Sequence, residues 1–581
     1  MMKYFYVIWI AILISLKVPG QVSEFENHLL HWWVPVKGYQ QVKPREHPRL
    51  LFRKSDIPAL LEKANTPEGQ AIIKRLRYLL DGGNGDRLAT LFNPATGAYT
   101  LGKNHSLVID TAGVYTFSHV AGYGLLYQLT GDRKYADLGR RSFELALKGQ
   151  RDRDDRYSWV APGGALRAGP VLGWYAVGYD LCYDGWDEPT REKFGKAIEN
   201  YDAGIEKRDA RGNVTLETLV SGTMPPFSNH FGMQAGGAAL ALMAVSGEPW
   251  VNQQRIDSLL KISELSMIRN VTEGFGNGGF FAEGDGTGSM ASHIVYLIAI
   301  QAWKNAMGMD FINSGRPNVV MTALKWFYLT VIRDGKPDFW PIRGAYPNNV
   351  WDRKLSGAGY VGTGLGVVTN EQKQAIKWYY NHFLLPHDIK EGIAYDAGIY
   401  PHQAVSAFVN WPVDLEERNP GEVLSHCYRD STFGFYAWRN RWQDENDIVM
   451  SVLTKPAKGY MGAKADSSVQ IAAFGRKFSW GKIPGEVKFW DSSEKGKTST
   501  MTFADGTTII VDFTGASGAD ALLLTTGEAE GRKVTSGDVV VTIMFLTQGK
   551  EPLVKVRKNS IFIGKQIINV MNGNIALHTN T

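Results

Sequence analysis

Cysteine is nearly absent from this chain, since only Cys182 and Cys427 occur among its 581 residues. So few cysteines exclude a small disulfide-stapled scaffold. A pair between them is possible in an oxidising compartment, but two buried thiols suit a chain with 44 % apolar residues better. The sequence also lacks HxH, HExxH and CxxC spacings, so no metal-binding motif is recognised. The stretch SHCYRD (425–430), which contains His426, is closest to a ligand group, and we interpret it as the start of a strand.

Runs of one charge and apolar runs of membrane length are lacking too. The net charge is only +5, and no Lys/Arg run of the kind that follows a phosphate backbone is present, so nucleic acid is not an expected partner. The apolar run from Phe5 to Leu16 is too short to span a bilayer. It follows Lys3 and precedes small residues near Gly20, which predicts a signal peptide over residues 1–20. We therefore expect an exported protein, periplasmic or extracellular in a bacterium, without a membrane span or a lipoprotein anchor.

The pattern of apolar residues changes once along the chain. From about Ser55 to Leu385 they recur at helical spacing, whereas from about Phe433 onward they alternate as in short strands. The boundary lies between residues 386 and 432. The sequence predicts an all-α domain over residues 21–390 and an antiparallel β-sandwich over residues 391–581.

The helical part contains a weak repeat. Residues 125–147 and 241–263 share the order of apolar helix, Gly with an acid, aromatic residue and second apolar helix, and residues 300–312 begin in the same way. Repeated helix pairs must stack on their neighbours to cover their apolar faces, so they form either an open solenoid or a closed ring. A ring would leave one concave face, lined by loops, for a long ligand.

Four blocks carry a resemblance that spans most of residues 47 to 480. The chain resembles the heparinase II/III-like and alginate-lyase-like polysaccharide lyases in HPRLLFRKSDIPALLEKA (47–64), SNHFGMQAGGAALAL (228–242), GGFFAEGDGTGS (278–289) and GAKADSSVQIAAFGRKF (462–478). The resemblance implies an (α/α) toroid followed by an antiparallel β-sandwich, in a secreted enzyme that cleaves uronic-acid polysaccharides. Related toroid enzymes sometimes hold a cation against the sandwich, which leaves room for a structural divalent cation.

Cleavage of such a polymer by β-elimination requires particular side chains. A base removes the C5 proton of the uronate, charge builds on the adjacent carboxylate, and an acid protonates the departing oxygen at C4. The C5 proton is too weakly acidic unless hydrogen-bond donors neutralise the carboxylate. The site therefore needs amide, imidazolium or guanidinium donors beside a Tyr or His.

The resemblance places the first candidates in two of the blocks. Asn229 and His230 match the block in which an Asn or His serves as carboxylate neutraliser or base, although Asn229 is also suited to capping a helix. Glu283 and Asp285 lie in the toroid-loop block, where the alternative is a solvated Gly-rich turn. His293 and Tyr296 would share one face if the following helix has already begun, although each could equally be a core residue.

The chain departs from the family at two positions. Thr287 stands where the lyases usually carry a Tyr, and Lys464 and Asp466 occupy the sandwich block that usually contains a His. These departures put the usual Tyr/His machinery in doubt.

Substitutes are found in FWPIRGAYPNNVWDR (339–353), a loop rich in aromatic and guanidinium groups. There Tyr346 is the candidate catalytic Tyr and Arg343 the uronate clamp, with Trp351 and Arg353 as further contacts. The alternative is an inter-helix loop tied to the sandwich.

Aromatic residues typical of sugar subsites occur in two further stretches, residues 110–119 and 159–180. The candidates for the ligand groove there are His119, Arg167, Trp174 and Tyr175.

Two other functions stay open. A glycoside hydrolase on the same scaffold, such as a uronidase, would use Glu283 or Asp285 as acid and another carboxylate as base or nucleophile. A non-catalytic glycan-binding protein would need the aromatic groove but no titratable cluster. In all three readings the partner is an anionic, uronate-containing glycan.

Overall fold

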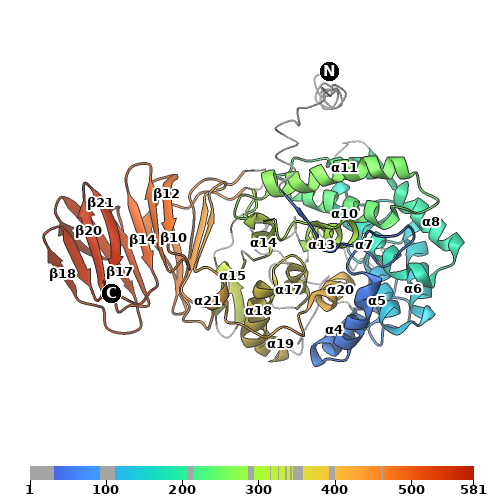
Figure 1. The fold of residues 1–581 in the computed structure, drawn as a ribbon, viewed down its shortest axis with the longest axis horizontal. Helices are drawn as coiled ribbons and strands as arrows, with labels where there is room; N and C mark the ends of the chain where they lie inside the picture. Colours follow the sequence, from blue (N-terminus) through green and yellow to red (C-terminus); the bar gives the residue numbers. More distant parts are fainter. Residues whose placement is uncertain are drawn as a thin grey trace, which may run out of the picture.

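The computed structural model shows a helical domain followed by stacked sheets, with the helices on the right and the strands on the left of Figure 1. The predicted fold class, helices first and antiparallel strands second, is confirmed. The predicted signal peptide lies outside the described part of the chain. The structure describes residues 32–91, 112–205, 213–284, 293–314, 316–324, 326–333, 336–340, 343, 358–390, 400–458 and 462–580.

Six helices form a closed inner ring. Each packs on the next, and the last packs on the first again. In ring order they are α5 (His119–Thr130), α7 (Ala165–Cys182), α10 (Asn229–Val245), α13 (Tyr296–Met307), α17 (Ala358–Leu365) and α20 (Pro401–Asn410). Of the two arrangements that the repeat predicts, the chain therefore adopts the closed ring, an (α/α) toroid.

The outer helices lie between the inner ones in chain order. They are α4 (Pro67–Asp81), α6 (Arg133–Leu147), α8 (Glu188–Glu199), α11 (Gln253–Arg269), α14 (Pro317–Leu324) and α18 (Asn370–Tyr379). Composition separates the two layers: α7 and α10 are buried nearly all round, whereas α6 buries one face only. The predicted helix pairs at 125–147 and 241–263 correspond to α5–α6 and α10–α11.

Glycines fix the register between α7 and α10. A Cβ atom at Gly169 would lie 2.2 Å from Met233 O, and one at Gly173 would lie 2.9 Å from Gly237 Cα. Both pairs have the same offset of 64 residues (169 to 233 and 173 to 237), so the two helices run parallel and touch along their backbones. Because an outer helix separates each pair of inner helices, the inner helices begin at the same end of the ring.

The C-terminal part consists of three antiparallel sheets. The first contains β7 (Cys427–Asp430), β8 (Phe435–Arg439), β9 (Val449–Leu453), β10 (Ser468–Ala473) and β11 (Arg476–Lys482) in chain order. The second contains β12 (Val487–Ser492), β13 (Thr498–Phe503), β14 (Thr508–Asp512), β15 (Ala521–Thr525), β17 (Val539–Leu546) and β16 (Arg532–Ser536) in spatial order. The third contains β18 (Val554–Arg557), β19 (Ser560–Ile563), β20 (Gln566–Met571) and β21 (Asn574–Thr579).

These sheets stack in three layers, so the predicted sandwich has a third sheet. One apolar core joins the five- and six-stranded sheets, and a second core joins the six- and four-stranded sheets. The outer face of the five-stranded sheet contributes Phe435, Ala437 and Leu453 to the core of the helical domain. The five-stranded sheet is therefore the layer that meets the ring (Figure 1).

The predicted domain boundary at residue 390 is too early. Helix α20, which closes the ring, begins at Pro401, and the short α21 (Pro420–Val423) follows it. The strands begin at Cys427, within the transition zone of 386–432. The sequence hides this helix because it follows a Gly- and Asp-bearing segment, residues 391–399, that is typical of a linker.

Both cysteines are free, Cys182 being buried in α7 and Cys427 partly exposed at the start of β7. Among the described helices, none combines the length and the apolar composition that a bilayer crossing requires.

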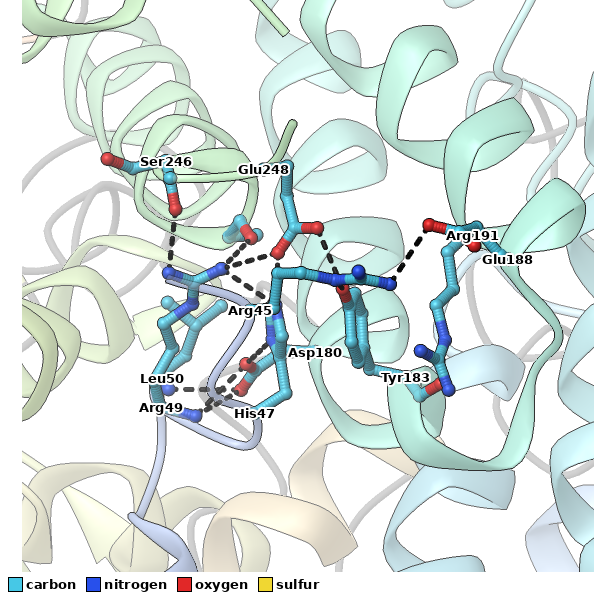
Figure 2. A network of polar contacts seen from close by, with 12 residues as sticks. Arg45, His47, Arg49, Leu50, Asp180, Tyr183, Glu188, Arg191, Ser246 and Glu248 are labelled. Carbon is cyan, nitrogen blue, oxygen red and sulfur yellow. Dashed lines mark hydrogen bonds and ion pairs between the residues drawn. The ribbon is translucent and has the colours of Figure 1, made fainter. Parts of the chain in front are cut away.

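A buried polar network ties the N-terminal segment to the far end of the ring (Figure 2). The carboxylate of Asp180, in the last turn of α7, lies 2.6 Å from His47 Nδ1 and accepts hydrogen bonds from the backbone amides of Arg49 and Leu50. The Arg49 guanidinium donates to Ser246 O and Ala244 O at the C-terminus of α10. A cation that satisfies the last carbonyls of a helix is favoured by the helix dipole.

Glu248 completes this network. Its Oε1 lies 2.9 Å from His47 Nε2, and its Oε2 accepts a 2.8 Å hydrogen bond from Tyr183. The HPRLLF block, which carries part of the family resemblance, thus has a structural role at the end of the ring opposite the helix N-termini.

Candidate active site

The N-termini of the inner helices gather at one end of the toroid, because these helices run in the same direction. Each helix N-terminus carries unpaired amide groups and the positive end of the helix dipole. An end of the ring where several such termini meet attracts anions. The sequence candidates Asn229, His230 and Arg167 all lie in the first turn of an inner helix at this end.

Asn229 and Glu283 are in direct contact, although 54 residues separate them. Glu283 Oε2 accepts a 2.8 Å hydrogen bond from Asn229 Nδ2 and lies 3.3 Å from the Asn229 backbone amide. Both side chains are buried: Glu283 is 2 % exposed and Asn229 is 6 % exposed. The carboxylate thus lies at the N-terminus of α10, where the helix dipole stabilises negative charge.

Asn229 does not cap this helix, contrary to the alternative reading of the sequence. The N-cap is Ser228, whose hydroxyl accepts from the His230 amide, and Asn229 is the first helical residue. The Asn229 side chain is therefore available to bind Glu283 and, through its second amide proton, a ligand.

The five-stranded sheet holds the loop that carries Glu283. The backbone amides of Gly278 and Phe280 donate to Asp430 Oδ2 at the end of β7, at 3.0 and 2.9 Å. The Phe280 ring stacks on Phe435 of β8 with 4.4 Å between centroids. Gly279 has φ +81°, and a Cβ there would lie 2.7 Å from Thr322 N, so this position requires glycine. The Gly-Gly-Phe-Phe sequence thus fixes the loop where ring and sheet meet.

The two candidate histidines differ in setting. His230 follows Asn229 in α10 and is partly exposed, whereas His293 is buried just before α13. Since α13 begins only at Tyr296, the condition under which His293 and Tyr296 would share a helical face is not met. Tyr296 is fully buried, its hydroxyl donates a 2.6 Å hydrogen bond to Met267 O, and burial raises its pKa. Tyr296 is therefore a core residue and not a ligand contact.

Three of the predicted groove residues also prove to be core residues. His119 is fully buried with Thr116 N donating to its Nδ1 and Leu80 O beside its Nε2, and burial lowers its pKa to about 4. Trp174 donates a 2.9 Å hydrogen bond to Ile294 O, and Tyr175 lies 2.5 Å from the hydroxyl of Tyr115. These side chains pack inside the wall of a closed ring, which leaves them no free edge for a sugar.

Arg343 is not placed as a uronate clamp. Its Nε and Nη2 donate to Asp466 Oδ2 at 2.9 and 2.6 Å, and its Nη1 donates to Ser451 Oγ at 2.9 Å. The guanidinium is buried and lies over the Phe435 ring at 5.3 Å. The alternative reading, a loop tied to the sheets, describes Arg343 better.

Replacing Arg343 by alanine is expected to lower stability without changing substrate affinity. The change leaves the half-buried Asp466 carboxylate without its charged partner, which typically costs about 1–3 kcal/mol. The midpoint of urea unfolding should fall, while KM for any substrate should stay within about twofold. A large rise in KM with an unchanged unfolding midpoint would show instead that Arg343 binds the substrate.

Four other candidates lie outside the described residues: Asp285, Tyr346, Trp351 and Arg353. Within the described ranges no three His, Cys, Asp or Glu side chains gather as metal ligands would.

An aromatic cluster that the sequence reasoning missed lies beside the inner-helix N-termini. His402, in the first turn of α20, has its ring 5.4 Å from Phe117 and 4.8 Å from Trp174. Burial and the charge of Arg153 lower its pKa to about 3, so the imidazole is neutral. The signal that could have located it is Tyr-Pro-His at 400–402, since proline is common at the first position of a helix.

Comparisons with known proteins find distant likeness in shape only. No family model and no curated protein matches the sequence. A heparan sulfate lyase, HepC from Pedobacter heparinus, is similar in structure at TM-score 0.41 and 11 % identity, over 89 % of this chain and 89 % of that one. A heparinase III gives 0.36 and 12 %, over 90 % and 86 %. A chondroitin AC lyase from Streptomyces coelicolor A3 gives 0.39 and 9 %, over 89 % and 76 %. At such identities the likeness assigns no role to any residue of this chain.

Proposed function

We propose that this chain is an exported polysaccharide lyase of the heparinase II/III-like type, which cleaves a uronate-containing glycan by β-elimination. The observation that carries the proposal is the buried contact between Asn229 and Glu283 at the positive end of α10. The sequence blocks that contain these two residues are two of the four that resemble the lyases.

The reaction would proceed as follows at this pair. The second amide proton of Asn229 donates to the uronate carboxylate and stabilises the charge that develops on it. A base takes the C5 proton, the C4–O bond breaks, a C4–C5 double bond forms, and the departing oxygen receives a proton. His230, which follows Asn229 in the first turn of α10, is the candidate for this base, and His293 is the second candidate histidine.

Glu283 orients the amide in this scheme. Its carboxylate accepts from both the side chain and the backbone of Asn229, so the Asn229 Nδ2 group is held in one orientation. The same contacts stabilise the negative charge of Glu283, which suits a positioning group better than a general acid. This argues against the hydrolase in which Glu283 is the acid.

The reaction type can be read from its product. The purified protein, incubated with glycans that contain glucuronate, mannuronate or iduronate, is expected to produce the ultraviolet absorbance of a 4,5-unsaturated uronate. New reducing ends without this absorbance would contradict the lyase and establish the hydrolase. Binding of the glycan with neither the unsaturated product nor new reducing ends would contradict both enzymes and support the non-catalytic glycan-binding protein.

A further inference from the structure

Arg167 lies at the same level of the ring as the Asn229–Glu283 pair. It is the third residue of α7, and the 64-residue register between α7 and α10 places it at the level of Phe231, two residues after Asn229. Two residues correspond to a rise of about 3 Å along a helix. The side chain of Arg167 leaves α7 on another face: Arg167 lies three turns before Gly178, where a Cβ atom would meet Val120 and Ala121 of α5, so Arg167 and Asn229 share a level of the ring but lie on the two sides of α7.

The Arg167 guanidinium is buried without a polar partner. The residue is 7 % exposed, its Nε and Nη1 are buried, and neither makes a hydrogen bond. Asp154, on the preceding loop, is already engaged by Arg156, which donates to its two carboxylate oxygens at 2.9 and 2.8 Å. Across the described residues Arg167 has no ion pair. A buried cation in this state is costly for the folded protein unless an anion compensates it.

The surroundings of Arg167 suit an oxyanion of a sugar. The guanidinium lies over the Tyr157 ring at 5.3 Å, and Tyr157 in turn packs on Phe117 at 4.7 Å. The helix dipole and the planar fork of five N–H donors both favour a carboxylate or a sulfate.

We propose that Arg167 binds a second anionic group of the ligand, a carboxylate or a sulfate ester on the sugar next to the one that contacts Asn229. That the group belongs to a glycan rests on the proposed function, whereas the anion site itself does not. The competing explanation is that Arg167 serves only to stack on Tyr157.

Anion-dependent stability tests the site without any turnover. The thermal unfolding midpoint of the full chain is measured against sodium sulfate and against sodium glucuronate, each compared with sodium chloride at equal ionic strength. We expect at least one of the two to raise the wild-type midpoint saturably beyond chloride, and Arg167→Met to lose this response. A response to sulfate would indicate a sulfated ligand, and a response to glucuronate a carboxylate ligand.

Two variants serve as controls. Arg167→Lys keeps a cation without the fork and should weaken the response rather than abolish it. Arg191 lies over the Tyr183 ring at 4.4 Å but donates to Tyr183 O, so Arg191→Met should respond to anions as the wild type does. Without anion, Arg167→Met should unfold no earlier than the wild type, because it removes an unpaired buried charge. The long apolar methionine side chain keeps the contact with Tyr157.

The outcomes separate this proposal from the lyase. If neither anion stabilises the wild type beyond chloride, or if Arg167→Met responds equally, the anion site is refuted whatever the enzyme activity. If the unsaturated product forms, Arg167→Met should raise KM by about tenfold or more and change kcat by less than about threefold. If no product forms but the anion response depends on Arg167, the site stands and the lyase does not.

Discussion

Glu283→Gln is expected to lower turnover of the uronate glycan by about two orders of magnitude or more, the usual loss when an acid/base or charge-stabilising group is removed. Glutamine has the size of glutamate but no charge, and its amide can turn its NH2 toward Asn229. The Asn229 amide would then lose its fixed orientation and its charged acceptor. The measurement is kcat from the absorbance of the unsaturated product, with the unfolding midpoint recorded in parallel.

A matched control uses the same substitution ten residues earlier. Glu273 is exposed and forms a surface ion pair with Arg269 at 2.8 Å, so Glu273→Gln should leave kcat within about twofold of the wild type.

Asn229→Ala and His230→Ala should each lower turnover on a scale similar to Glu283→Gln. If Asn229 and Glu283 act as one unit, the double variant should lose little more activity than either single variant. Unchanged turnover in Glu283→Gln would mean that the contact is structural only.

The fold could be predicted where one period dominates the sequence. Helical spacing and weak repeats predicted stacked helix pairs, and ring closure then needed only the contact of α20 with α5. The third sheet was harder to predict, because β14 and β15 lie in the middle layer and are buried on both faces. Such strands read as continuous apolar runs, and their sequence does not say how many sheets they join.

The site could be predicted where chain topology alone brings residues together. Asn229 begins one inner helix and Glu283 precedes the next one, so ring closure suffices to place them near each other. Arg343 could not be interpreted in this way, because its partner Asp466 lies 123 residues further along in another domain. The prediction that the aromatic residues of α7 line a ligand groove was wrong for a different reason. Helical spacing does not distinguish a groove from the wall of a ring that is buried on every side.

The buried network at the opposite end of the ring predicts the largest loss of stability. Asp180→Ala removes the acceptor for His47 Nδ1 and for the backbone amides of Arg49 and Leu50, all of which are buried (Figure 2). Breaking a buried ionic network by deleting one partner typically costs about 3–5 kcal/mol. The expected result is a lower midpoint of urea unfolding. The measurement is the far-ultraviolet circular dichroism of the helices as a function of urea concentration.

A surface pair nearby provides the comparison. Asp184, four residues after Asp180, pairs with Lys54 at 2.6 Å, but its side chain is 36 % exposed and that of Lys54 is 52 % exposed. Asp184→Ala should therefore cost less than about 1 kcal/mol, as exposed ion pairs usually do. Asp180→Asn, which keeps an acceptor but not the charge, should fall between the two. Equal midpoints for Asp180→Ala and Asp184→Ala would show that the N-terminal segment contributes little to closing the ring, and that helix packing alone holds α7 and α10 together at this end.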